Sequence, residues 1–284
     1  MKVLILGASG LVGNAIFRHL NENFYQEHQT WGVFRSLAES KYSDISYKDK
    51  AIKVDDLLDD QELRSVISDS EPDVIVNCLS ANPEDFNDLS KLLSMFSVFP
   101  QKLKFLCDQL GVRLIQISSD AVYSGSKGFY SEKDITDFTD NYGMSKFLGE
   151  VDGKNCLTVR SSFIGKNCSN NKGLVNWFLA QDGSCFGYKD YIFSGFPVNV
   201  FAGILATELL GNTSLNGIYH IASDPISKYD LLGLIANVYG KKIEIIPKTH
   251  TLVDRSLNAD NFRIATGYSA PDWQSLVNSM FLYK

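Results

Sequence analysis

Two short segments carry residue types that suit carbonyl chemistry with a nucleotide cofactor. A glycine-rich segment, Gly7-Ala-Ser-Gly-Leu-Val-Gly13, lies near the start of the chain, and Tyr142-Gly-Met-Ser-Lys146 lies near its middle. Glycines let the backbone turn tightly and approach a pyrophosphate, whose charge then faces the N–H groups at a helix N-terminus. A tyrosine and a lysine four residues apart on a helix share one face, so the ammonium can stabilise a phenolate. Together the segments predict nicotinamide-dependent carbonyl chemistry.

The proton donor has two candidates, because Tyr123–Lys127 also matches the Tyr-x-x-x-Lys spacing. The residues inside that match are Ser-Gly-Ser, which is typical of a turn. Tyr142 instead opens a helical pattern that runs through Phe147 and Leu148, so we predict Tyr142 as the proton donor. A free phenol has a pKa of about 10, and Lys146 together with an oxidised nicotinamide would lower it.

Ser119 supplies a third polar group, just past the apolar strand Leu114–Ile117. We predict that its hydroxyl holds the substrate carbonyl oxygen beside Tyr142. Taken alone, Ser118-Ser119-Asp120 is more typical of an ordinary turn that ends a strand.

The cofactor contacts are predicted at the carboxyl ends of strands, where parallel sheets bind ligands. They comprise Gly7, Ser9, Gly10, Leu11, Val12 and Gly13 in the glycine turn, Arg35, Asp56 and Leu57 after the next two strands, Cys78, Leu79 and Ser80 after the fourth, and Tyr142 and Lys146. Lys146 can also bind the cofactor ribose.

Arg35 stands where an NAD-preferring site usually carries an acid, and it could meet a 2′-phosphate. The sequence therefore favours NADPH, while NADH stays open because Glu39 is a late substitute for that acid and Arg35 could be a solvated loop residue. Asp56 either accepts a hydrogen bond from the adenine amino group or belongs to an acid-rich helix N-terminus.

The elements that must position these residues alternate between strands and helices. Strands are predicted at Val3–Leu6, Thr30–Phe34, Ala51–Val54, Val74–Cys78, Arg113–Ile117, Leu157–Val159 and Ile218–Ala222, with helices at Leu11–Asn23, Asp60–Ser68, Phe86–Leu110, Asn141–Val151 and Val200–Leu210. Continuously apolar strands between helices predict an α/β fold with a Rossmann-type, doubly wound parallel sheet. We expect residues 1–166 to form the NAD(P)-binding core, completed by about 195–222. Residues 167–194 and 223–284 would form a smaller α/β substrate-binding lobe.

Composition argues against several other classes of protein. The formal net charge of −6 disfavours binding to nucleic acid or to an anionic membrane surface. No stretch is long enough to span a bilayer. The five cysteines form no Cys-x-x-Cys pair and the four histidines never pair at metal-ligand spacing, so we expect a reducing, cytoplasmic compartment and no metal.

With these residues laid out, the chain resembles an extended short-chain dehydrogenase/reductase, and within that group the dTDP-4-dehydrorhamnose reductases. The likeness rests on the Gly-x-x-Gly-x-x-Gly spacing and on the segments Pro72–Asn77, Leu114–Tyr123, Asn141–Glu150, Val159–Ser162 and Gly217–Ser223.

This resemblance implies NADPH-dependent reduction of the C4 ketone of a nucleotide-diphosphate-linked 4-keto-6-deoxy sugar, in deoxysugar and surface polysaccharide biosynthesis. The proton would come from Tyr142, assisted by Lys146 and Ser119, and the substrate would also contact Asp120 and Phe163. The expected partner is a nucleotide sugar, and homodimer formation is left open.

Departures from the family pattern keep the sugar and the nucleotide open. Phe163 stands where the family usually has Trp, Phe96-Ser97 stand where it often has Val-Asn, and Ser194–Asn199 differs from the usual segment. A UDP-linked 2-acetamido-4-keto-6-deoxyhexose is therefore a competing substrate.

Three other activities share this fold. A 4,6-dehydratase needs an acid after Asp120, where Ala121 stands. An epimerase needs a tightly held NAD that is regenerated within each cycle, and the absence of an acid at the second strand end argues against it. A non-catalytic regulatory subunit, such as that of methionine adenosyltransferase, binds nucleotide without turnover. The presence of Ser119, Tyr142 and Lys146 favours the enzyme.

Overall fold

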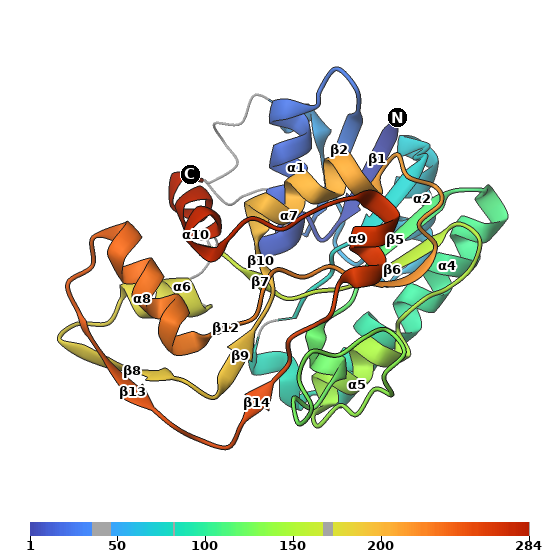
Figure 1. The fold of residues 1–284 in the computed structure, drawn as a ribbon. Helices are drawn as coiled ribbons and strands as arrows, with labels where there is room; N and C mark the ends of the chain where they lie inside the picture. The colour runs from blue at the N-terminus through green and yellow to red at the C-terminus, as the bar shows by residue number, and fades with distance from the viewer. Residues whose placement is uncertain (36–46, 82, 167–172, 284) are drawn as a thin grey trace. The chain divides into compact units, whose positions relative to one another are not determined.

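The computed structural model describes residues 1–35, 47–81, 83–166 and 173–283 (Figure 1). The chain forms two compact units. The first comprises Met1–Ser118, Asp140–Val159 and Ala202–Ile218, and the second comprises Ser119–Thr139, Arg160–Phe201 and Tyr219–Lys284. Each unit is therefore assembled from segments that are separated in the sequence.

The first unit is built on a seven-stranded sheet with the order β3-β2-β1-β4-β5-β6-β11. The strands are β1 (Lys2–Leu6), β2 (Gln29–Phe34), β3 (Ala51–Lys53), β4 (Val74–Asn77), β5 (Arg113–Ile117), β6 (Cys156–Arg160) and β11 (Gly217–His220). Neighbours from β3 to β6 pair in parallel. The strand order reverses between β1 and β4, and sheets of this kind bind ligands beside such a reversal, at the carboxyl ends of the strands.

Helices cover both faces of this sheet. On one face, Leu63 of α2 (Asp60–Ser70) and Leu103 of α4 (Phe99–Leu110) share a buried cluster with Leu4 of β1. Gly32 of β2 points to the other face, because Val33 beside it belongs to that cluster. A Cβ on Gly32 would lie 2.7 Å from the ring of Phe17, so α1 (Leu11–Asn23) covers the second face. The predicted doubly wound α/β fold is confirmed.

One long helix of the prediction, Phe86–Leu110, is wrong in detail. The segment consists of a 3-10 turn (Pro83–Asn87), α3 (Leu89–Leu93), a π-helical turn (Ser94–Val98) and α4. Pro100 has no N–H group for the carbonyl of Phe96, so the ordinary helical hydrogen bond cannot form there. The helix predicted at Asn141–Val151 is α5 (Asn141–Leu148), and a Cβ on Gly149 would lie 1.6 Å from the Phe96 oxygen. The end of α5 therefore packs directly on the π-helical turn.

The second unit contains short sheets and four helices wholly within its segments of the described chain. Its strands and helices are β7 (Phe163–Ile164), β8 (Ser184–Tyr188), β9 (Tyr191–Phe193), β10 (Phe196–Pro197), β12 (Ile226–Ser227), β13 (Glu244–Lys248), β14 (Val253–Asp254), α6 (Leu174–Leu179), α8 (Lys228–Tyr239), α9 (Asp260–Thr266) and α10 (Trp273–Leu282). α7 (Val198–Ile204) joins the second unit to the first. No helix in the described part of the chain combines the length and apolar composition that crossing a membrane requires.

The boundary between the units differs from the expected ranges. Residues 119–139 were expected in the core but belong to the second unit, as do residues 160–166, 195–201 and 219–222. The physical reason for the first segment is a backbone ladder: Tyr130 N–H donates to the Ser256 carbonyl, and Asn258 N–H donates to the Tyr130 carbonyl. A role of the second unit in binding substrate stays a prediction.

Candidate active site

The glycine turn joins β1 to α1 beside the end of β4. Gly7 has a φ of +78°, a left-handed conformation that favours glycine, and a Cβ there would lie 3.0 Å from the Cys78 carbonyl. A Cβ on Gly10 would lie 2.9 Å from Ser80 Oγ, and one on Gly13 would lie 2.3 Å from the Gly7 oxygen. Backbone atoms therefore leave no room for a side chain at Gly7 or Gly13, whereas at Gly10 the close neighbour is the Ser80 side chain.

The N-terminus of α1 suits an anion. Gly10 is its N-cap, supplies no side-chain hydrogen bond, and is followed by no acidic residue in the first turn. The first N–H groups of a helix need acceptors from outside it, and the helix dipole favours negative charge there. The predicted contact residues Gly7, Ser9, Gly10, Leu11, Val12 and Gly13 all lie in this turn, which fits the pyrophosphate of a dinucleotide.

The other predicted cofactor contacts follow neighbouring strands of the same unit. Leu79 follows β4, with its Cα 3.1 Å from the Cβ position of Gly7. Arg35 lies exposed in the bend after β2, whereas Glu39 lies outside the described residues. Asp56 is exposed and its Oδ1 accepts a hydrogen bond from Leu58 N–H at 2.9 Å. Asp56 thus shapes a local turn, and its contact with adenine stays a prediction.

Asp59, rather than Asp56, is the N-cap of α2. Leu57 is partly buried against the core cluster described above.

Lys146 reaches from α5 to the end of β5. Its Nζ donates to the Ile117 carbonyl at 2.7 Å and lies 4.8 Å from the centre of the Phe96 ring. Only 5% of Lys146 is exposed. Burial lowers the pKa of Lys146 to about 8, opposed by the weaker effects of Cys78 and Glu150. A lysine with this pKa can change its protonation state near neutral pH.

Tyr142 is half-buried between two phenylalanine rings. Its ring stacks on Phe86, with centroids 4.7 Å apart, and meets Phe96 edge-on at 5.7 Å. Asp140 caps α5 by accepting a hydrogen bond from Gly143 N–H. Because Tyr142 and Lys146 are four residues apart on α5, they share one helix face, and both rest against Phe96. The first unit therefore brings together the two predicted members of the proton-transfer pair.

Ser119, Asp120 and Phe163 belong to the second unit. Ser119 is buried, its Oγ accepts a hydrogen bond from Ala121 N–H at 3.1 Å, and it donates to Asp120 Oδ1 at 3.2 Å. Ser119 thus caps a 3-10 turn, the ordinary role that the sequence also allowed. Burial raises the pKa of Asp120, opposed by the charge of Arg255 and by hydrogen bonds to serines.

Phe163 lies in β7 with its ring 4.7 Å from that of Phe201. The contacts of Ser119, Asp120 and Phe163 with substrate stay predictions.

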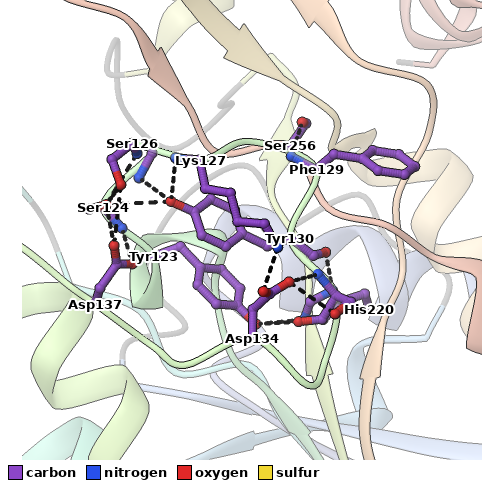
Figure 2. A network of polar contacts seen from close by, with 12 residues as sticks. Tyr123, Ser124, Ser126, Lys127, Phe129, Tyr130, Asp134, Asp137, His220 and Ser256 are labelled. Atoms are coloured by element: carbon purple, nitrogen blue, oxygen red, sulfur yellow. Dashed lines mark hydrogen bonds and ion pairs between the residues drawn. The ribbon is translucent and has the colours of Figure 1, made fainter.

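The side chains of the competing pair, Tyr123 and Lys127, form structural hydrogen bonds and an ion pair (Figure 2). The Tyr123 hydroxyl accepts from Arg160 Nη1 at 2.6 Å, donates to the Ser131 carbonyl at 3.0 Å, and lies 3.2 Å from His220 Nε2. Lys127 forms an ion pair with Asp134. Tyr123 is also fully buried. These contacts leave Tyr142 as the better candidate for the proton donor.

Comparison with known proteins decides the family. A family model described as the RmlD substrate binding domain matches residues 1–281. The chain belongs to this family.

Proteins similar to this RmlD-family chain include dTDP-4-dehydrorhamnose reductases and a subunit of methionine adenosyltransferase 2. A hypothetical dTDP-4-dehydrorhamnose reductase from Sulfolobus tokodaii is 25% identical, with 96% of this chain and 98% of that chain covered and a TM-score of 0.76. The dTDP-4-dehydrorhamnose reductase of Bacillus anthracis, solved in complex with NADP, shares the fold at 18% identity and a TM-score of 0.81, covering 99% and 98% of the two chains. Methionine adenosyltransferase 2 subunit beta from Xenopus laevis is 24% identical over 88% of this chain and 74% of that protein.

Sequence reasoning missed three residues that contact the proton-transfer pair or are linked to it by hydrogen bonds in this RmlD-family fold. Phe96 contacts both Tyr142 and Lys146, although it was noted only as a departure from the family pattern. Asn77 and Gln116 lie in strands whose other residues are mostly apolar, and their buried amides form a hydrogen bond. A polar residue inside an apolar strand was the available signal for this pair.

Proposed function

We propose that this protein is a cytoplasmic, NADPH-dependent reductase of the C4 ketone of a nucleotide-diphosphate-linked 4-keto-6-deoxy sugar, acting in deoxysugar and surface polysaccharide biosynthesis. The observation that carries the proposal is the arrangement on α5. Tyr142 and Lys146 share one helix face, and Lys146 is buried against the Ile117 carbonyl in the unit that holds the glycine turn. Membership of the RmlD family supports the substrate class.

Each residue has a defined task in this proposal. The glycine turn holds the pyrophosphate and Arg35 receives the 2′-phosphate of the cofactor, which supplies the hydride when bound. Tyr142 gives the proton to the carbonyl oxygen, and the Lys146 ammonium stabilises the phenolate that remains. Ser119 donates a hydrogen bond to the same carbonyl oxygen, and Asp120 and Phe163 contact the sugar.

The direct test follows NADPH absorbance with dTDP-linked and UDP-linked 4-keto-6-deoxyhexoses offered separately. We expect oxidation of NADPH with one of them. Tyr142→Phe should lower turnover by about 10²–10⁴-fold, the usual contribution of a general acid, while the affinity for NADPH changes little. Absence of oxidation with both sugars would contradict the substrate class, and unchanged turnover in Tyr142→Phe would contradict the assignment of the acid.

A second candidate function is that of a non-catalytic regulatory subunit. It is favoured by one observation, the match over 88% of this chain to methionine adenosyltransferase 2 subunit beta. This function predicts a stable complex with the methionine adenosyltransferase catalytic subunit of the same organism, detectable by co-elution in size-exclusion chromatography. The complex should form equally well with Tyr142→Phe, because a non-catalytic role needs no proton donor.

A further inference from the structure

A buried pair of amide side chains joins β4 to β5. Asn77 and Gln116 are partners in the parallel register, and they are only 2% and 3% exposed. Asn77 Nδ2 donates to Gln116 Oε1 at 2.8 Å. Ile75 and Leu114, which belong to the apolar core cluster, stand two residues before Asn77 and Gln116. Alternate residues of a strand share a face, so the amide pair lies on the sheet face that carries this cluster. Amides buried among apolar side chains are costly unless their hydrogen bonds are satisfied.

Backbone groups at both ends determine the orientation of these amides. An N–H group can only donate, so the oxygen of Asn77 is the atom that faces Leu79 N–H, at 3.2 Å. A carbonyl can only accept, so the Nε2 of Gln116 is the atom that faces the Ile117 carbonyl, at 3.1 Å. The four groups form one chain of hydrogen bonds that runs from Leu79 to Ile117.

The Ile117 carbonyl is where this chain meets Lys146. A carbonyl oxygen has two lone pairs, and here Gln116 and Lys146 each donate to it. The amide therefore influences both the direction of the carbonyl and its strength as an acceptor for the ammonium. At the other end, Leu79 borders the glycine turn, with its Cα 3.1 Å from the Cβ position of Gly7.

We propose that Asn77 and Gln116 are positioning residues for Lys146, which they hold through the Ile117 carbonyl in a fixed relation to the segment beside the glycine turn. The effect on turnover rests on the proposed reductase function, whereas the effect on Lys146 itself can be measured without any substrate. Among the described residues, the ionisable groups that act on Lys146 are Cys78, which follows β4, and Glu150, which follows α5.

The test replaces the amide by a side chain of similar length that cannot donate, Gln116→Met. Without the competing donor, the Ile117 carbonyl accepts more strongly from the ammonium, so the pKa of Lys146 should rise by about 0.5 or more. It is measured by NMR titration of protein labelled with ¹³C-lysine, with the Lys146 signal assigned from Lys146→Arg. We also expect kcat to fall about tenfold and its pH profile to shift in the same direction, because the ammonium is less well placed.

Asn77→Leu is the second variant, because it removes the hydrogen bond that Asn77 donates to Gln116. It should raise the pKa of Lys146 by less than Gln116→Met does. Thr158→Val is the matched control. Thr158 is the β6 partner of Gln116, is fully buried, and exchanges hydrogen bonds with the backbone of Val151. This control should lose stability and leave the pKa of Lys146 unchanged.

The proposal is wrong if folded Gln116→Met and Asn77→Leu both retain the wild-type pKa of Lys146. It is also wrong if Thr158→Val shifts that pKa as much as they do, because the shift would then reflect loosened packing. If the wild-type protein oxidises NADPH with none of the sugars, the reductase function fails, and the NMR titration still decides the positioning role.

Discussion

At the scale of single residues, burial lowers the pKa of two basic side chains, Lys146 and His220. The consequences differ between them. Lys146 is buried in the first unit, where its lowered pKa suits a part in proton transfer. His220 is buried in the second unit, where its ring contacts Tyr123 and the Tyr130 carbonyl, and its pKa is lowered to about 4 (Figure 2). The first group supports the proposed chemistry, while the second ties stability to pH.

Replacing His220 should reduce the acid sensitivity of the fold. Burial is the main cause of its low pKa, followed by the charge of Arg160, so the unfolded chain binds the proton first as pH falls. The stability that neutral His220 contributes is complete above pH 6.5 and is lost as pH falls toward 4. When the pH falls from 6.5 to 4, His220→Gln should therefore lose less of its free energy of unfolding than the wild-type protein does. The difference between the two losses should be at most about 3 kcal/mol.

Urea unfolding at several pH values measures this difference. The control is His250→Gln, because His250 is exposed in the same unit. If the free energy of unfolding falls with decreasing pH as steeply in His220→Gln as in the wild-type protein, other groups determine the acid sensitivity.

Removing the charge of Lys146 should stabilise the fold while it abolishes turnover. The pKa of Lys146 is lower in the folded protein than its ordinary value of 10.5, so burial penalises the ammonium below about pH 8, and the penalty is relieved as pH rises from 8 to 10.5. Lys146→Met should raise the free energy of unfolding at pH 7 by about 1–3 kcal/mol, and by less near pH 10.

Chemical denaturation at the two pH values tests this expectation, with exposed Lys133→Met as the control. A loss of stability in Lys146→Met at pH 7 would mean that the contacts of the ammonium outweigh its burial.

Prediction at the scale of secondary structure succeeded where local pattern and packing agree. Strands buried on both faces are mostly apolar, so β1 and β5 were predictable, and the glycine turn marked the start of α1. The break in the long helix had a local signal in Pro100, which the prediction passed over. The packing of Gly149 against the Phe96 oxygen could not be predicted, because it joins residues that are distant in the chain. The amide pair was missed because only the sheet register brings Asn77 beside Gln116.

The contact between Gly149 and the π-helical turn makes a prediction about α5. A Cβ on Gly149 would overlap the Phe96 oxygen, so Gly149→Ala must displace the end of the helix that carries Tyr142 and Lys146. We expect a loss of about 1–3 kcal/mol in stability, together with a fall in turnover. Thermal unfolding and NADPH oxidation measure the two effects.

The matched control is Gly233→Ala, inside α8, where nothing lies within 4 Å of the added Cβ. It should stabilise the protein by about 0.5–1 kcal/mol, because alanine is the better helix former. Wild-type stability and turnover in Gly149→Ala would mean that α5 accommodates the methyl group without moving.

The whole molecule combines a cofactor-type turn in one compact unit with Ser119 and Asp120 in the other. The proteins it resembles include a hypothetical dTDP-4-dehydrorhamnose reductase and methionine adenosyltransferase 2 subunit beta, so fold alone does not decide between the two functions. Cofactor preference is a property that can be measured before the sugar is known. The proposed function assigns this preference to Arg35, in the unit that contains the glycine turn.

Binding of NADPH should stabilise the whole protein against unfolding. A ligand that binds only the folded chain adds RT ln(1 + [L]/Kd) to the free energy of unfolding. At about 100 times Kd this amounts to about 2.7 kcal/mol, and NADH at the same concentration should add less if Arg35 receives the 2′-phosphate. Arg35→Gln should then weaken NADPH stabilisation and leave that by NADH unchanged, whereas Arg64→Gln, on exposed α2 surface, should alter neither. Equal stabilisation by both cofactors would mean that Arg35 is a solvated surface residue that does not bind the 2′-phosphate. If neither cofactor stabilises the protein, it does not bind a nicotinamide cofactor, and the proposed reductase function is wrong.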